Sequence, residues 1–161
     1  MLKFLFLILA NFVIAQEGYP KPKASEKLLF YIQHSSNHNT FIYEKSSDKN
    51  QPISVSRINY EDKGQKESLT AIQRKFAYGV EFRNDSKTQF SLAAIKKSEF
   101  MIKTQNGKSW VELQLPKLKI KVDHIFIQLA GNVNGIKAKA DYILVYGKTA
   151  NNKSIVEKIV L

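Results

Sequence analysis

The sequence predicts an all-β domain: a mainly antiparallel β-sandwich or barrel of about ten short strands, with one short α-helix. Three features of the chain predict this class. Apolar and polar residues alternate with a period of two along most of its length. Aromatic and aliphatic residues gather in short runs, and turn-forming residues separate these runs at the spacing of a sandwich or barrel. Hydrophobic residues make up 43% of the chain, which is typical of a folded rather than a disordered protein.

The N-terminus has the pattern of a secretory signal. Residues 1–15 contain an early positive charge at Lys3, an apolar run and a small residue at Ala15, after which a signal peptidase could cut. The apolar run is shorter than the ~20 residues that span a bilayer, and no later run reaches that length. The sequence therefore predicts a secreted or periplasmic protein without a transmembrane segment after cleavage. Residues 16–27 are expected to form an extended lead-in to a single β-rich domain over residues 28–161.

The first two strands are expected at Leu28–His34 and Thr40–Glu44, which are both rich in aromatic and aliphatic residues. Residues 35–39 between them are all polar or turn-forming. The two strands should therefore form a hairpin.

The next run changes phase. Apolar residues alternate with serines from Ile53 onward, but Ile58 and Tyr60 continue the alternation one residue out of step. Two explanations stay open: a β-bulge near Ser56 and Arg57 resets the register, or Arg57 faces the core. An inward arginine would indicate a site for an anion or a carboxylate.

One short helix is expected over Ser68–Tyr78. Ser68 should cap its N-terminus, and Gly79 should close its last turn in the left-handed conformation. Gln73 falls at the edge of the apolar face, where its amide could bond to strand backbone or contact a ligand. The apolar residues that share the face expected to pack on the sheet are Leu69, Ile72 and Phe76.

The remaining strands follow the helix, with Asn84, Asp85, Asn106 and Gly107 as turn signals. Lys117–Val122 has the cleanest alternation in the chain. The expected strands are Val80–Phe82, Phe90–Ile95, Phe100–Thr104, Trp110–Leu115, Lys117–Val122, His124–Leu129, Asp141–Gly147 and Ser154–Leu161.

Four segments together resemble a known family: LLFYIQHSSNHNTFIYE (28–44), PISVSRINY (52–60), LTAIQRKFAYGVEF (69–82) and DYILVYGK (141–148). This is the uncharacterised secreted bacterial family catalogued as domain of unknown function 4833, which carries similar FYIQ-x-S-x-N-x-NT-x-x-YE and QR-x-x-AYG segments. The resemblance implies no activity, substrate or cofactor. It implies an arginine where His34 stands, and a tryptophan and an arginine near Arg57 and Asn59. If those positions form a shared site, this chain has altered it.

No motif in the chain predicts a cofactor, a nucleotide or a metal. His34 and His38 are four residues apart, but they fall at a strand end and its turn, where they are expected to be solvated and where the spacing fixes no metal geometry. The glycines form neither the dinucleotide nor the P-loop pattern. Asp123 precedes His124, which is half of a hydrolase triad, but no serine lies in a G-x-S-x-G elbow.

The net charge and the ratio of lysine to arginine indicate which classes of binding partner are favoured. The formal net charge is +11, or +10 without Lys3, and the basic residues are 22 lysines and 3 arginines. Lysine occupies every second place in Lys117–Val122, as on the solvent face of a strand, whereas arginine is the residue expected for phosphate recognition. The charge therefore argues against nucleic acid and favours non-specific attraction to anionic envelope polymers or lipid surfaces. The chain has no cysteine, so its core alone must hold the fold, which suits a bacterial envelope or secreted protein.

The candidate site joins the polar turn of the first hairpin to the end of the helix. Its amides, hydroxyls and cations suit a polar neutral or anionic ligand such as a glycan, although the asparagines could simply make the turn and the tyrosines fill the sheet. The ligand-binding candidates are His34, Asn37, Asn39, Thr40, Tyr43, Arg57, Gln73, Arg74 and Tyr78.

The favoured function is a secreted or periplasmic, non-catalytic binding module for a glycan, peptide or envelope component. One alternative is a hydrolase that uses His34 or His124 with a carboxylate. The other is a structural envelope protein, which self-association of the purified domain would reveal.

Overall fold

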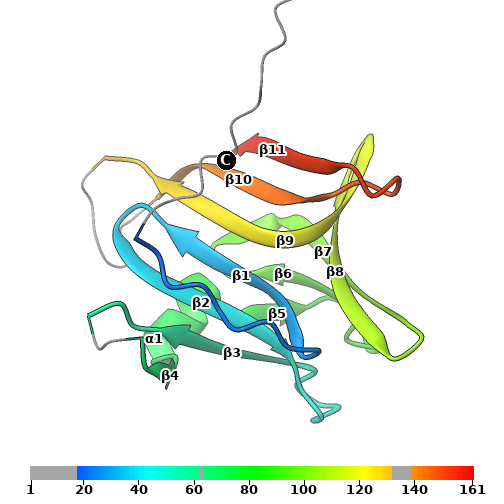
Figure 1. The fold of residues 1–161 in the computed structure, drawn as a ribbon, viewed down its shortest axis with the longest axis horizontal. Helices are drawn as coiled ribbons and strands as arrows, with labels where there is room; N and C mark the ends of the chain where they lie inside the picture. The colour runs from blue at the N-terminus through cyan, green and yellow to red at the C-terminus, as the bar shows by residue number, and fades with distance from the viewer. Residues whose placement is uncertain (1–17, 62–63, 132–138) are drawn as a thin grey trace, which may run out of the picture.

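The computed structural model describes residues 18–61, 64–131 and 139–161. Its strands form an 11-stranded sheet, in the order β4-β3-β2-β1-β9-β8-β7-β6-β5, with β10 paired to β9 and β11 paired to β10. The sheet curls so that its two parts face each other, which confirms the predicted all-β class (Figure 1). The strands are β1 (Leu28–His34), β2 (Asn37–Lys45), β3 (Ile53–Ile58), β4 (Lys66–Ser68), β5 (Val80–Phe82), β6 (Gln89–Leu92), β7 (Ile95–Gln105), β8 (Lys108–Leu115), β9 (Leu118–Leu129), β10 (Ala140–Lys148) and β11 (Ser154–Val160).

The long strand β9 joins the two parts of the sheet. Its first residues pair antiparallel with β8, and its second half pairs in parallel with β1, where Tyr31 lies opposite His124. Its other edge pairs with β10, and that ladder shifts register between Tyr146 and Gly147, so Asp123 is the extra residue of a β-bulge. The two strands expected at Lys117–Val122 and His124–Leu129 are therefore one strand, interrupted by this bulge.

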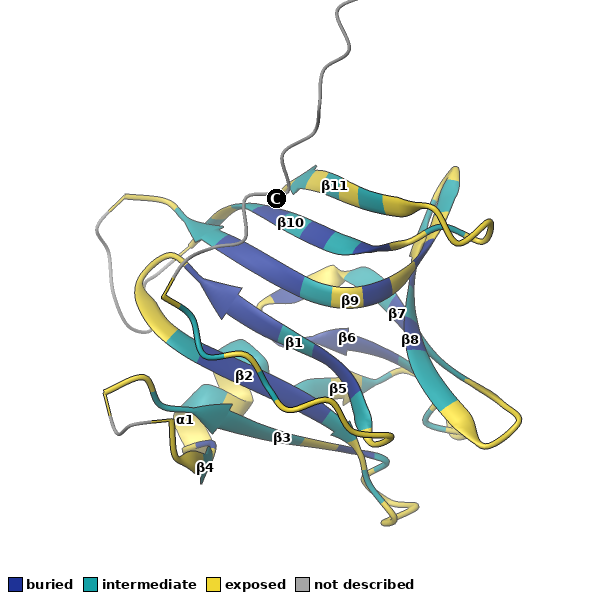
Figure 2. Cartoon of the chain, viewed as in Figure 1, coloured by how far each residue is buried: buried dark blue, intermediate teal, exposed yellow. Residues whose placement is uncertain are grey.

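The core lies between the two layers and is built on aromatic rings. Phe30 stacks on Tyr43 with the ring centroids 4.3 Å apart, and the rings of Phe90 and Phe100 lie 6.4 Å and 6.2 Å from Phe30. All four side chains are fully buried. Figure 2 shows the buried positions along the middle of β1, β2, β9 and β10, while β11 alternates between exposed and half-buried residues.

Arg57 faces the core, and the bulge considered for β3 is wrong. The β2–β3 ladder runs without a register shift and places Arg57 opposite Phe41, on the inward face. On its other side Arg57 lies opposite Glu67 of β4, a short strand that the sequence did not predict. The Arg57 Nη2 atom is 2.7 Å from Glu67 Oε2, so the inward cation is neutralised by a neighbouring carboxylate.

The helix begins later than expected and changes type along its length. It consists of α1 (Ala71–Gln73) and a π-helical segment η1 (Arg74–Tyr78). Its N-cap is Thr70, because Ser68 is still the last residue of β4. Thr70 Oγ1 accepts a hydrogen bond from the Gln73 backbone N–H at 3.2 Å, while Gln73 Oε1 accepts one from the Thr70 N–H at 3.1 Å. Together these two bonds form a capping box.

The predicted packing of the helix is also wrong. Leu69 is buried, but Ile72 is 56% and Phe76 is 52% exposed. Leu69 precedes the N-cap and therefore does not belong to the helical face. The π-turn, with its i→i+5 bonds, brings Tyr78 inward instead, where its ring stacks on that of Phe41 at a centroid distance of 3.4 Å.

Gly79 does not adopt the left-handed conformation that was expected, since its φ is −67° and its ψ is 159°. It is required for space: a Cβ atom there would lie 1.8 Å from the backbone oxygen of Arg74. We expect Gly79→Ala to lower the free energy of unfolding by about 1–3 kcal/mol, because the π-turn must shift to admit the methyl group. Urea unfolding measures the change, and unaltered stability would contradict this role for Gly79.

The hairpin after the helix turns earlier than expected. The strand predicted at Phe90–Ile95 is wrong, because residues 93–94 form a turn in which Leu92 lies opposite Ile95. The turn expected at Asn106 and Gly107 is confirmed. Both residues have positive φ, as a two-residue hairpin turn requires.

The described part of the lead-in, residues 18–27, runs without strand or helix across the outer face of β1 and β2 (Figure 1). Thr40 Oγ1 donates to the Pro20 carbonyl at 2.6 Å, and the Tyr19 hydroxyl donates to the His34 carbonyl at 2.9 Å. The expected signal, residues 1–15, lies outside the described residues. In the part that is described, the helix is too short to cross a membrane.

Candidate functional site

An open groove lies where the β7–β8 hairpin, the start of β9, the β10–β11 turn and the segment 24–28 meet. Its volume is about 990 Å³. The walls come from segments far apart in the sequence, so the groove exists only in the folded chain. Its side chains with an aromatic ring or a charge include Lys108, Trp110, Glu112, Lys119, Lys121 and Lys148.

Trp110 is held in a fixed orientation in this groove. Its indole Nε1 donates to Glu112 Oε1 at 2.9 Å, which is favourable because residues two apart on a strand share a face. The Lys121 ammonium lies 4.8 Å from the centre of the Trp110 ring, within the range of a cation–π contact. The groove therefore combines a flat apolar surface with adjacent positive charge.

The lysines of the groove repel one another. Lys121 lies directly opposite Lys148 in the β9–β10 ladder, and Lys119 is two residues from Lys121 on the same face of β9. Like charges directly opposite each other on neighbouring strands are destabilising. Glu26 and Glu112 are the carboxylates of the lining, so four lysines outnumber two acids. Glu112 lies opposite Lys121 in the β8–β9 ladder and offsets part of this repulsion, and an anion bound between Lys121 and Lys148 would relieve the rest.

The predicted site residues in the first hairpin serve the turn. Asn37 Oδ1 accepts a hydrogen bond from the Asn39 backbone N–H at 2.9 Å. Asn39 Oδ1 in turn accepts one from the Tyr60 backbone N–H at 2.9 Å. These bonds shape the turn and tie it to the end of β3, as expected of asparagines in turns.

Thr40 and Tyr43 are fully buried. Besides its bond to the lead-in, Thr40 Oγ1 accepts a hydrogen bond from Gln33 Nε2 at 3.0 Å. The Tyr43 hydroxyl donates to the Tyr78 carbonyl at 2.8 Å and so ties β2 to the end of the helix. In this structure both hydroxyls bond to the chain itself.

His34, Arg57 and Tyr78 do come together, at one end of the inward face. The His34 and Tyr78 rings lie 5.8 Å apart, and both stack against Phe41. Burial raises the pKa of Tyr78 above its ordinary value, while the charge of Arg57 acts in the opposite direction. His34 is only 4% exposed, so the expectation of a solvated histidine is wrong. The three residues form an interior cluster.

Gln73 and Arg74 do not join that cluster. The Gln73 amide completes the capping box of the helix, and Arg74 is exposed. The nine candidates therefore divide among the turn, the interior cluster, the helix and two further buried positions, Thr40 and Tyr43.

A family model for a domain of unknown function, DUF4833, matches residues 30–158. The chain belongs to the DUF4833 family. The resemblance drawn from its sequence segments is thereby confirmed. The curated proteins and the solved structures compared with the chain contain no significant match. The DUF4833 match includes the strands that wall the groove, whereas the segment 24–28 precedes it.

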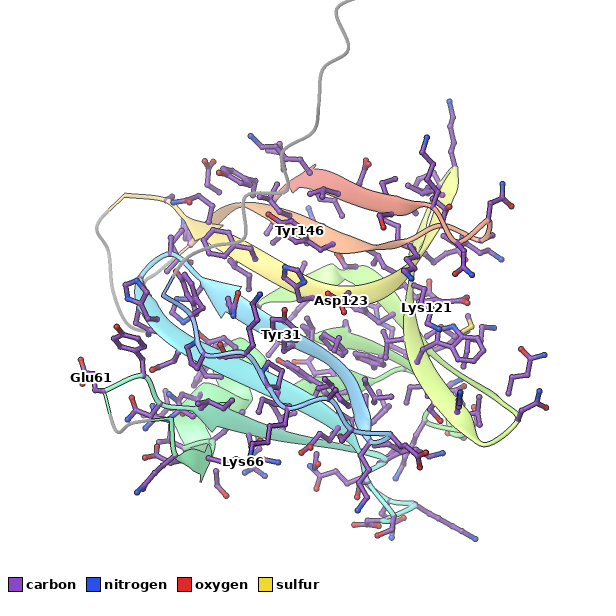
Figure 3. The ribbon with its side chains drawn as sticks, in the orientation of Figure 1. Tyr31, Glu61, Lys66, Lys121, Asp123 and Tyr146 are labelled. Atoms are coloured by element: carbon purple, nitrogen blue, oxygen red, sulfur yellow. The ribbon has the colours of Figure 1, made fainter. Side chains whose placement is uncertain are left out.

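The DUF4833 domain also contains the histidine–carboxylate pair expected at residues 123 and 124. The bulge in β9 turns both side chains to the outer face, where His124 Nδ1 lies 2.8 Å from Asp123 Oδ2. The imidazole is sandwiched between Tyr31 and Tyr146, with ring centroids at 4.9 Å and 4.2 Å. Figure 3 labels Tyr31, Asp123 and Tyr146 on the three adjacent strands β1, β9 and β10.

The Asp123–His124 pair and its surroundings shift the pKa values of Asp123 and Tyr31. The hydrogen bond from His124 holds the pKa of Asp123 below its usual value, against the opposing effect of burial. Burial, helped by the charge of Asp123, raises the pKa of Tyr31 to about 12. Among the described residues, no serine or threonine hydroxyl is hydrogen-bonded to His124. The arrangement thus orients the imidazole but offers it no serine or threonine nucleophile to activate.

Sequence reasoning missed the groove of this DUF4833 domain. The available signals were the one tryptophan of the chain and the alternating lysines at positions 117, 119 and 121. From the sequence alone, both features fit ordinary strand residues. Figure 3 shows Lys121 where β9 adjoins β8, beside the strand that carries Trp110.

Proposed function

We propose that this DUF4833 protein is an exported, non-catalytic module that binds an acidic glycan in the groove around Trp110. The observation that carries the proposal is the Lys121–Lys148 pair, two like charges held opposite each other beside a fixed indole. A cleft lined by one sign of charge raises the local concentration of oppositely charged ligands. Beside the Lys121 ammonium, the part of the indole that lines the groove offers an apolar surface to the C–H face of a sugar ring, and the lysines offer charge to its carboxylate or phosphate groups.

The make-up of the groove favours a glycan over a nucleic acid. Among its lining residues the cations are lysines, and arginine, the residue best suited to bidentate phosphate contacts and base stacking, is missing. One aromatic ring also differs from the series of stacking platforms that track a single strand of nucleic acid. A single ring flanked by flexible point charges fits one charged sugar unit.

Export is supported by residues 1–15, whose charge, apolar run and small residue match a secretory signal. The absence of cysteine from the chain fits a protein that needs no disulfide outside the cytoplasm. Fractionation of cells that express the full chain, compared with a chain lacking residues 1–15, tests this. If both forms stay in the cytoplasm, the proposal that the protein is exported is wrong.

We expect Lys121→Gln/Lys148→Gln to weaken binding of polygalacturonate by about tenfold or more, because the variant removes the two positive charges that would meet the carboxylates of the polymer. A tenfold change in affinity corresponds to about 1.4 kcal/mol. Binding by the parent should fall as salt is raised, because the contacts are charged and open to solvent. Quenching or enhancement of Trp110 emission provides the measurement, and Trp110→Ala, followed by calorimetry, should weaken binding as well.

The matched control is Lys49→Gln/Lys97→Gln, which removes the same charge from positions outside the groove. It should bind polygalacturonate nearly as the parent does. Neutral dextran should not bind. Equal losses in the two double variants would show that net charge alone attracts the polymer, and the groove would then not be the site.

A further inference from the structure

The helix presents an apolar face that the rest of the described chain leaves uncovered. Ile72 is 56% exposed and Phe76 is 52% exposed. The two residues lie four positions apart on one continuous helical segment. Figure 2 shows the exposed positions on this helix at the edge of the molecule.

The exposure follows from how the helix is anchored. Its inward contacts are made from its end, where the Tyr78 ring stacks on Phe41 and the Tyr78 carbonyl accepts the Tyr43 hydroxyl. Because Tyr78 occupies the inward position, Ile72 and Phe76 are directed elsewhere. The exposure of Ile72 and Phe76 thus follows from the π-turn.

The charge around this face is positive. Arg74 and Lys75 are both exposed, and residues 68–80 contain no aspartate or glutamate. The Lys75 ammonium lies 5.3 Å from the centre of the Phe76 ring, so charge and apolar surface are adjacent. Arg74 and Lys75 also line, with Ala71, a shallow hollow of about 490 Å³.

We propose that this face docks the protein on a membrane surface that carries anionic lipids. Exposed Ile72 and Phe76 would enter the boundary between headgroups and acyl chains, while Arg74 and Lys75 would meet the lipid phosphates. This combination of an apolar face with flanking basic residues characterises helices that lie in the interface of a bilayer. With two apolar side chains and two cations the attachment is weak and reversible, and it requires anionic lipid.

Cosedimentation of the intact protein with lipid vesicles tests the docking surface. The parent should bind vesicles of phosphatidylcholine mixed with phosphatidylglycerol, and bind vesicles of phosphatidylcholine alone far less. Ile72→Ser/Phe76→Ser should reduce partitioning by about tenfold. Val156→Ser/Val160→Ser, which changes two exposed apolar residues of β11, should bind as the parent does.

Two further variants separate this face from the groove. Lys121→Gln/Lys148→Gln should keep most of the vesicle binding, because those lysines lie in the groove rather than on the helix. In Phe76→Trp the added indole should shift its emission to shorter wavelength only with anionic vesicles. The proposal is overturned if the parent does not bind, if Ile72→Ser/Phe76→Ser binds fully, if binding is lost with the groove lysines, or if the new tryptophan reports no change.

Discussion

Replacing Phe30 by alanine is expected to lower the free energy of unfolding by about 3–5 kcal/mol. Phe30 is 1% exposed, and its ring contacts Tyr43 on the neighbouring strand and faces Phe90 and Phe100 across the core. The substitution removes the ring at the place where the two layers meet, and close packing leaves little freedom for the neighbours to fill the cavity. A domain of this size has a total stability of about 5–15 kcal/mol, so a loss of this size removes a large part of it.

Urea unfolding, followed by the emission of Trp110, measures this loss. The matched control is Phe76→Ala, which makes the same chemical change at a position that is 52% exposed. It should alter stability by no more than about 0.5 kcal/mol. Similar losses in the two variants would mean that the core is not organised around the Phe30 ring or that Phe76 is covered in solution.

The strands were predictable because side chains alternate between the two faces of a sheet. In β8 the buried Val111 and Leu113 alternate with half-buried or exposed residues, and the bounds expected from this pattern agree closely with the structure. The alternation alone cannot distinguish two separate strands from one strand that continues through a β-bulge. Lys117–Val122 and His124–Leu129 have opposite phases, and only the pairing with β10 shows that one extra residue, Asp123, joins them into β9.

The sequence predicts the position of the helix correctly but not the side chains that it packs on the sheet, because the helix changes type along its length. An apolar spacing of three and four assumes regular α-helical turns. The segment Arg74–Tyr78 is π-helical, so the inward position passes from Phe76 to Tyr78. The steric conflict at Gly79, where a Cβ atom would meet the Arg74 carbonyl, exists only in this geometry. The sequence alone therefore does not indicate that Gly79 is required for space.

The prediction for the first hairpin is wrong about the exposure of His34, because the turn is shorter than the sequence indicates. A loop over residues 35–39 would leave His34 at the end of the strand, in contact with water. In the structure β2 begins at Asn37, and His34 pairs with it across a two-residue turn. His34 therefore continues the inward face of β1 that contains Phe30 and Ile32.

The groove could not have been assembled from the sequence, because it depends on which strands are neighbours. The alternation of lysines in Lys117–Val122 does indicate a solvent face. Its meaning changes when Lys148 from β10 is placed opposite Lys121 and Trp110 from β8 lies beside it. Strand order of this kind is a long-range property, which residue periodicity does not encode.

A second large effect is expected from acid. Burial lowers the pKa of His34 from 6.5 to about 4. Ser36 Oγ lies 2.8 Å from His34 Nδ1, while Nε2 is a buried atom without a hydrogen-bond partner among the described residues, so a proton added to the ring would be poorly solvated. Above pH 6.5 the imidazole is neutral in the folded and unfolded states, and His34 imposes no penalty. Between pH 6.5 and about 4 the unfolded state binds a proton that the folded state excludes, so the free energy of unfolding falls by a total of about 3 kcal/mol.

Urea unfolding at a series of pH values measures this slope. In His34→Phe, which keeps an aromatic ring against Phe41 and Tyr78, the slope in this window should nearly vanish, whereas His38→Gln, at an exposed position, should retain it. Asp123, whose pKa is lowered, loses its stabilising effect only as pH falls through and below its unfolded value of 3.8, so it contributes mainly below the window. An NMR titration should show the His34 ring protonating near pH 4. An unchanged slope in His34→Phe would show that His34 is solvated in the folded protein, and the interior cluster with Tyr78 would have to be abandoned.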